Sequence, residues 1–94
     1  MSKNQLDTEI VTANILGSPY NVILFNDDHH SFEEVILQVV KAVKCSMTKA
    51  LAIVMEAHSA GQAVAFTGGL ERCEHVDSIL AGPPCSLSTD IQPA

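Results

Sequence analysis

The sequence predicts an α+β domain, a two-layer α/β sandwich in which three helices cover a three-stranded antiparallel sheet in the order β-α-α-β-α-β. A short run of β-branched and aromatic residues precedes two segments whose apolar residues recur at helical spacing. A second β-rich run, a third helical segment and an alternating tail complete the chain. Three helices stacked on one face of such a sheet would enclose a single hydrophobic core.

Composition limits the function classes that remain open. The 94 residues suffice for one small domain, and 47% are hydrophobic. Five Lys and Arg residues against 11 Asp and Glu give a net charge of −6, which disfavours nucleic-acid binding because phosphates require clustered cations. With no run of 18 apolar residues, no secretory signal and three widely spaced cysteines, we expect a cytoplasmic protein with reduced thiols and no membrane contact.

The first segment lacks periodicity. It closes at Gly17-Ser18-Pro19, so we expect a flexible extension over residues 1–18, in preference to an additional strand, and a core domain over residues 19–94. Residues 20–25 are apolar at nearly every position, which predicts a central strand covered on both faces. The polar cluster at residues 26–30 then predicts a loop.

Two helices should follow this loop. Ser31 and Glu34 form a predicted capping box. The apolar stripe behind it consists of Phe32, Val35, Ile36, Val39, Val40 and Val43. Ser46 can cap the second helix and Gly61 can end it in the left-handed conformation. Its predicted inner face consists of Met47, Ala50, Leu51, Val54 and Ala57.

The remaining segments predict a strand, a helix and a strand. Residues 62–66 are β-rich, and Thr67-Gly68-Gly69 should turn the chain into a helix over residues 70–80. Glu71 and Glu74 would favour the positive end of that helix. After a break at Gly82-Pro83-Pro84, residues 85–92 alternate between apolar and polar types, which predicts a strand with one polar face.

Enzyme and metal chemistry find little support. Asp27 and Asp28 lie near His29 and His30, and acids with histidines can perform acid–base work. The chain has no nucleophile elbow and no glycine-rich phosphate loop, so we expect no catalysis. Potential metal ligands are His29, His30, His58, His75 and Cys73. Their spacing places no two on one helix face, so we expect surface histidines and no metal or cofactor.

His58 and the Asn26-Asp27-Asp28 loop each allow two interpretations from the residues alone. His58 falls at the predicted end of the second helix, where a histidine commonly interacts with the last carbonyl groups. The loop could be a simple Asx turn between strand and helix. Both features could also serve binding.

Taken in order, these features resemble the Clp protease adaptor family, ClpS. The match consists of a strand ending in Asn26-Asp27-Asp28, an acid-capped helix, a second helix ending in His58-Ser59-Ala60-Gly61 and an alternating C-terminal strand. From Asn26 to Glu74 the register needs no insertion or deletion, and the resemblance covers about three quarters of the chain.

The resemblance implies a non-catalytic adaptor that acts as a monomer. Such adaptors bind N-degron proteins with N-terminal Leu, Phe, Tyr or Trp and deliver them to the AAA+ unfoldase ClpA of the ClpAP protease. The family positions matching Asn26, Asp27 and His58 bind the free α-amino group. This fits the chemistry of these residues, since a charged amine offers three donors to carbonyl, carboxylate and imidazole acceptors.

The resemblance also implies an apolar pocket for the first side chain. The matching positions are Phe32, Val54, Ala57 and Leu87, with His30 at the rim. Here the chain departs from the family, which commonly reads Asp-Asp-x-Thr-Pro-Met. Phe32 replaces a flexible Met, while Val54 and Ala57 stand where larger residues are usual. We therefore expect an altered choice of first residue with the amine site retained.

For unfoldase docking, Glu71 and Glu74 match the family's acidic positions on the third helix, whereas Val76 stands where a lysine is expected. The extension would contact the unfoldase as well. The main alternative is a protein–protein interaction module resembling the C-terminal domain of the ribosomal stalk protein. A charged helix face without a pocket would favour that alternative, and polar groups converging on a pocket mouth favour the adaptor.

Overall fold

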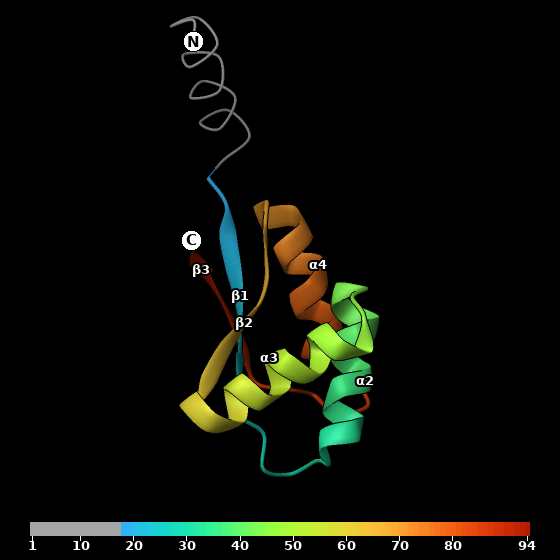
Figure 1. Cartoon of the computed structure of the whole chain (residues 1–94). Helices are drawn as coiled ribbons and strands as arrows, with labels where there is room; N and C mark the ends of the chain where they lie inside the picture. The colour runs from blue at the N-terminus through green and yellow to red at the C-terminus, as the bar shows by residue number, and fades with distance from the viewer. Residues whose placement is uncertain (1–17) are drawn as a thin grey trace, which may run out of the picture.

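The computed structural model describes residues 18–94, so the predicted extension lies outside the described residues except for Ser18. The elements are β1 (Tyr20–Phe25), α2 (Phe32–Val43), α3 (Met47–Ala60), β2 (Gln62–Gly68), α4 (Leu70–Leu80) and β3 (Thr89–Pro93). This order confirms the predicted α+β fold, with the helices gathered beside the sheet (Figure 1). Among residues 18–94, no helix is both long and apolar enough to cross a bilayer.

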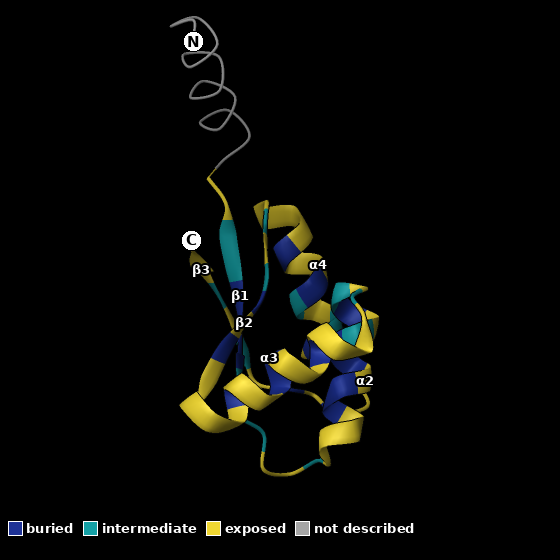
Figure 2. Cartoon of the chain, in the orientation of Figure 1, coloured by how far each residue is buried: buried dark blue, intermediate teal, exposed yellow. Residues whose placement is uncertain are grey.

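The sheet is antiparallel and has the strand order β2-β1-β3, so β1 is central as predicted. Val22 and Leu24 point into the helix-covered core, whereas Ile23 between them faces the other side of the sheet. Ile23 is buried nevertheless, because its partners in register are Val64 on β2 and Asp90 on β3. Buried positions recur along the helix faces that pack on the sheet (Figure 2).

The start of α2 follows the predicted capping box. The Ser31 hydroxyl accepts a hydrogen bond from the Glu34 amide, and the Glu34 carboxylate accepts one from the Ser31 amide. The predicted apolar stripe is buried at Val35, Ile36 and Val39, but Phe32 is 41% exposed. Its exposure places an aromatic ring at the surface beside the preceding loop.

A polar hub that the sequence pattern did not indicate lies within the core. Gln38 is 3% exposed, and its Nε2 donates to the carbonyl oxygens of Ile79 (3.0 Å), Leu80 (3.1 Å) and Gly82 (2.8 Å). Its Oε1 accepts from the Cys85 amide at 3.3 Å. Gln38 thus ties α2 to the end of α4 and to the segment that leads into β3.

The inner face of α3 differs from the prediction. Ala50, Val54 and Ala57 are buried as expected, but Met47 and Leu51 are 56% and 45% exposed. Ile53 occupies the core in their place. The helix is rotated from the predicted orientation, because Ile53 and Ala57 lie on the side that faces α2 and the sheet. Its two ends match expectation, with Ser46 as N-cap and Gly61 in the left-handed region at φ 91°.

The prediction for the C-terminal strand was wrong at its start. β3 begins at Thr89, whereas Cys85 and Leu87 are buried in a turn that precedes it. The Ser86 and Leu87 amides donate to the carbonyls of Gly82 and Leu80, and Ser86 adopts φ 50°, so the backbone there is not extended. The alternation of apolar and polar residues that begins at Cys85 therefore belongs at first to a loop that is hydrogen-bonded to the end of α4, and not to a strand. By contrast, β2 runs two residues beyond its predicted end because it pairs with the full length of β1.

We expect Gln38→Leu to lower the free energy of unfolding by about 1–3 kcal/mol, the cost of one unsatisfied buried group. The three carbonyls keep partners in the backbone amides of Gly82, Ser86 and Leu87, but the Cys85 amide loses its acceptor. Urea denaturation provides the measurement, with the exposed Gln62→Leu as a control expected to change stability by less than about 0.5 kcal/mol. Equal unfolding midpoints for the two variants would contradict the stabilising role of Gln38.

Candidate functional site

The loop after β1 is fixed at its start by two backbone hydrogen bonds. The Phe25 amide donates to Ser88 and the Asn26 amide donates to Gly61, each at 3.0 Å. Gly61 caps α3 three residues after His58. The loop is therefore tied to the end of the helix that carries His58 and to the segment that precedes β3.

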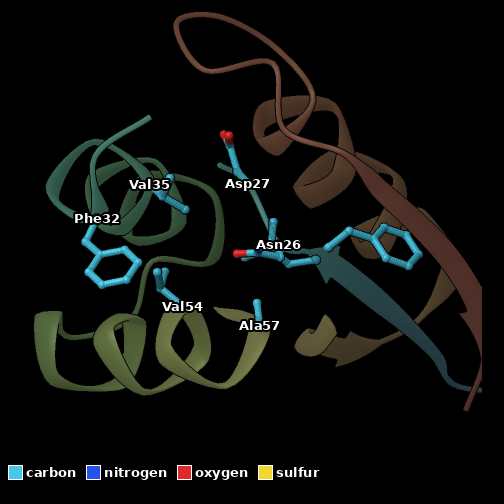
Figure 3. A pocket seen from close by; sticks show the side chains of 8 residues that line it. Asn26, Asp27, Phe32, Val35, Val54 and Ala57 are labelled. Atoms are coloured by element: carbon cyan, nitrogen blue, oxygen red, sulfur yellow. The ribbon is translucent and has the colours of Figure 1, made fainter. Parts of the chain in front are cut away.

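Asn26 presents an oriented amide to the space between α2 and α3. Its Nδ2 donates to Asp28 Oδ1 at 3.0 Å. That bond uses a donor of Asn26 and leaves the carbonyl oxygen available as an acceptor. In Figure 3 the Asn26 side chain extends toward the labelled side chains of the two helices.

Asp27 is held in a different direction. Its Oδ1 accepts from the His29 amide at 2.6 Å, and its Oδ2 lies 2.7 Å from Nδ1 of His30. Burial, which leaves the Asp27 side chain 9% exposed, opposes ionisation. The hydrogen bonds from the His29 backbone and the His30 side chain outweigh it and hold the pKa of Asp27 below its usual value. In Figure 3 the carboxylate points away from Val54 and Ala57.

An apolar pocket lies directly beside these polar groups (Figure 3). Its lining consists of Leu24, Phe25, Asn26, Asp27, Phe32, Val35, Val54 and Ala57. The pocket encloses only about 10 Å³ in this state, which is about the space of one water molecule. A larger side chain could enter only if a lining residue moved.

Phe32 is the one exposed residue among those that line the pocket. It is the first residue of α2, and its ring packs edge-on against the His58 ring at 5.0 Å between centroids and 79° between planes. This T-shaped geometry is favourable for two rings. Through it, His58 on α3 is joined to the pocket wall although it does not line the pocket itself.

The structure brings most of the predicted site residues together. Asn26, Asp27, Phe32, Val54 and Ala57 line one pocket, and His58 contacts its wall. Leu87 is buried in the core outside the pocket lining. Sequence reasoning missed Leu24, Phe25 and Val35, although all three adjoin predicted features, two at the end of the first strand and one in the apolar stripe of the first helix.

His30 lies on the other side of the loop. There it lines a second, open hollow together with Asn26, Asp27, His29, Cys85, Ser86 and Ser88. The hollow has a volume of about 230 Å³. Asp27 and Asn26 line both the pocket and the hollow, so the loop forms the partition between them.

The other predicted positions lie elsewhere. Glu71 and Glu74 are exposed on α4. Cys45, Cys73 and Cys85 are free thiols, and burial raises the pKa of both Cys73 and Cys85. Within the described part of the chain, no three His, Cys, Asp or Glu side chains form a group that could hold a metal ion.

The arrangement combines hydrogen-bond acceptors, a carboxylate and an apolar recess. A ligand that suits all three carries a positively charged donor next to an apolar group. The carboxylate attracts the charge, the Asn26 carbonyl accepts a hydrogen bond, and the recess removes apolar surface from water. A charged amine adjacent to a hydrophobic side chain meets this description.

Comparisons with known proteins point to one family. The family model described as ATP-dependent Clp protease adaptor protein ClpS matches residues 17–82. The chain is 41% identical over 56 residues to the ATP-dependent Clp protease adapter protein ClpS of Gloeobacter violaceus. This match spans 58% of the chain and 60% of that protein.

Two much larger proteins also match. The chain is 32% identical over 68 residues, 72% of its length, to the E3 ubiquitin-protein ligase UBR1 of Drosophila melanogaster. It is 31% identical over 61 residues, 65% of its length, to the E3 ubiquitin-protein ligase UBR2 of Homo sapiens. The chain spans only 4% of either ligase.

A solved structure supports the fold. The structure of Agrobacterium tumefaciens ClpS2 bound to L-phenylalaninamide superposes with a TM-score of 0.74 and 22% sequence identity. The match covers 82% of this chain and 98% of that one.

The lowered pKa of Asp27 predicts a pH-dependent contribution to stability. A depressed carboxyl pKa stabilises the folded state above the carboxyl's unfolded pKa of about 3.9, and this stabilisation is lost as the pH falls through the lower folded value. We expect Asp27→Asn to lower the unfolding free energy by about 1 kcal/mol at pH 7 and by less at pH 3. Urea denaturation at both pH values, with the exposed Glu74→Gln as control, checks this. An equal deficit at the two pH values would contradict it.

Proposed function

The chain belongs to the ClpS family of Clp protease adaptors, and on this premise we propose that it binds proteins through a free α-amino group and a bulky hydrophobic first residue. The observation that carries the proposal is the oriented Asn26 amide and the Asp27 carboxylate beside an apolar pocket. The polar loop and the apolar pocket correspond to the two parts of an N-degron. The amine would meet the polar loop, and the first side chain would enter the pocket.

Each polar group would make a different contribution to binding of the amine. Asn26 contributes a carbonyl acceptor, and Asp27 contributes negative charge together with the carboxylate lone pairs that His29 and His30 leave open. His58, in its neutral form, would supply a third acceptor beside the Phe32 ring. An acetylated N-terminus lacks the charge and the donors, so it would leave these groups unpaired.

The pocket sets the choice of the first residue. Because its enclosed space is small, an N-terminal Leu, Phe, Tyr or Trp side chain must displace the ring of Phe32. Burial of a Leu or Phe side chain contributes about 1.5–3 kcal/mol, enough to offset the edge-on ring contact that is lost. The pocket residues of this proposal are Phe32, Val54 and Ala57, with Leu87 behind them in the core and His30 on the far side of the loop.

Delivery of the bound protein would follow in the cytoplasm. We assign delivery to a ClpA-type AAA+ unfoldase, with Glu71 and Glu74 as docking residues. Both carboxylates are exposed on α4, and this helix contributes no residue to the pocket lining. Residues 1–18 would form the extension that engages the unfoldase, and residues 19–94 the binding domain. In this role the chain acts as a monomeric adaptor without a cofactor and without catalytic activity.

The amine requirement is tested with two labelled decapeptides that differ only in a free or acetylated N-terminal Leu. We expect at least tenfold tighter binding of the free form by fluorescence anisotropy, because each unpaired buried group costs about 1–3 kcal/mol. Asn26→Ala, Asp27→Ala and His58→Ala should each reduce this preference, whereas the exposed His75→Ala should not. Equal binding of both peptides would reject the adaptor function and favour the interaction module that needs no free amine.

The pocket is tested with four free-amine peptides that begin with Leu, Phe, Tyr or Trp. We expect the wild type to favour Leu over Trp, because the small enclosed space accommodates the smaller side chain with less displacement of Phe32. Phe32→Ala should raise the affinity for Trp relative to Leu severalfold and should preserve the preference for a free amine. An unchanged ranking in Phe32→Ala would show that Phe32 does not select the first residue.

A further inference from the structure

We propose that His30 is a positioning residue for the amine site, which holds Asp27 in place when neutral and weakens amine binding when protonated. This inference rests on the proposed function and assigns its pH regulation. The contact that carries it is the 2.7 Å approach of His30 Nδ1 to Asp27 Oδ2. His30 does not line the apolar pocket, so it would act on the ligand through Asp27.

The geometry gives His30 control over the direction of the carboxylate. Asp27 is held at both oxygens, by the His29 amide on one and by the His30 ring on the other. The His29 contact is made by the backbone and persists for any residue at that position except proline. The His30 contact is the one made by a side chain, so it depends on the identity of residue 30.

The Asp27 and His30 side chains differ in how far they are buried. The Asp27 side chain is 9% exposed, whereas that of His30 is 27% exposed. Water therefore reaches the imidazole more readily than the carboxylate. The lowered pKa of Asp27 keeps the carboxylate ionised through the pH range in which a histidine changes charge.

The sign of the effect follows from the charges. A neutral His30 donates its Nδ1 proton to Asp27 and leaves the negative charge available to the ligand's ammonium group. A protonated His30 places a positive charge on the same carboxylate, which cancels much of that attraction and repels the ammonium. Binding should therefore weaken as the pH falls.

The other titratable groups around His30 are few. Glu34 in the first turn of α2 and His29 in the loop lie near it, and Cys85 from the segment after α4 lines the same hollow. Glu34 is engaged with the Ser31 amide and Cys85 has a raised pKa, so neither changes charge between pH 5.5 and 7.5. Because His29 also lies near Asp27, the exposed His75 on α4 serves as the control.

The test measures the affinity for the free Leu decapeptide at pH 7.5 and pH 5.5. His30→Gln keeps a hydrogen-bond donor that cannot become charged, and His30→Ala removes the donor. We expect His30→Gln to bind within twofold of the wild type at pH 7.5. When the pH is lowered to 5.5, the affinity of His30→Gln should fall severalfold less than that of the wild type. His30→Ala should bind about fivefold more weakly at pH 7.5, and His75→Gln should follow the wild type at both pH values.

His58 is unchanged in all four proteins, so the difference between wild type and His30→Gln isolates His30. Identical pH profiles for these two proteins, or wild-type affinity in His30→Ala at pH 7.5, would overturn the inference. Thermal unfolding of each variant verifies that the fold is intact.

A second readout separates this inference from the proposed function. NMR titration of the Asp27 carboxyl carbon in the free protein should give a higher midpoint in His30→Ala than in wild type. If the wild type shows no preference for a free amine, the proposed function fails and the regulatory role fails with it, whereas the carboxyl titration still reports the His30–Asp27 contact. If the preference exists and the carboxyl midpoint does not move, the inference about His30 alone is rejected.

Discussion

Two backbone hydrogen bonds at the end of β1 determine the arrangement of the whole site, because they join three segments that are far apart in sequence. The Asn26 amide is bonded to Gly61 at the end of α3, and the Phe25 amide is bonded to Ser88 before β3. The antiparallel pairing of β1 with both neighbours brings these partners within reach. With the loop pinned in this way, the Asn26 side chain faces the same space as the helix that carries Val54, Ala57 and His58. The site is thus a consequence of the sheet order.

The pinned loop carries the two polar side chains that line the apolar pocket. Asn26 extends toward the helices, while Asp27, which lines both the pocket and the second hollow, is held by the His29 amide and the His30 ring. On the apolar side, the ring of Phe32 packs edge-on against the ring of His58. In the adaptor function that we propose, a first side chain that displaces the Phe32 ring would change this contact, which would link side-chain recognition to the amine site.

Much of the architecture could be predicted from local sequence signals. The Ser31–Glu34 capping box and the αL cap at Gly61 depend on nearby residues, and both are present. Three features depended on tertiary contacts instead. Burial of Gln38 depends on carbonyl groups that only the packed end of α4 supplies. The exposure of Met47 and Leu51 depends on how α3 is rotated against its neighbours, which helical spacing leaves open. The His30–Asp27 pair depends on side-chain direction within a loop.

In the proposed complex, a free amine and an apolar side chain meet between the Asn26–Asp27 loop and the end of α3. The most direct measurement maps backbone amide chemical shifts in the chain during titration with L-leucinamide, with N-acetyl-L-leucinamide as the comparison. We expect saturable shifts at Asn26, Asp27, Val54 and His58 with the free amine and much smaller ones with the acetylated compound. Shifts centred on α4, or equal shifts with both compounds, would contradict it.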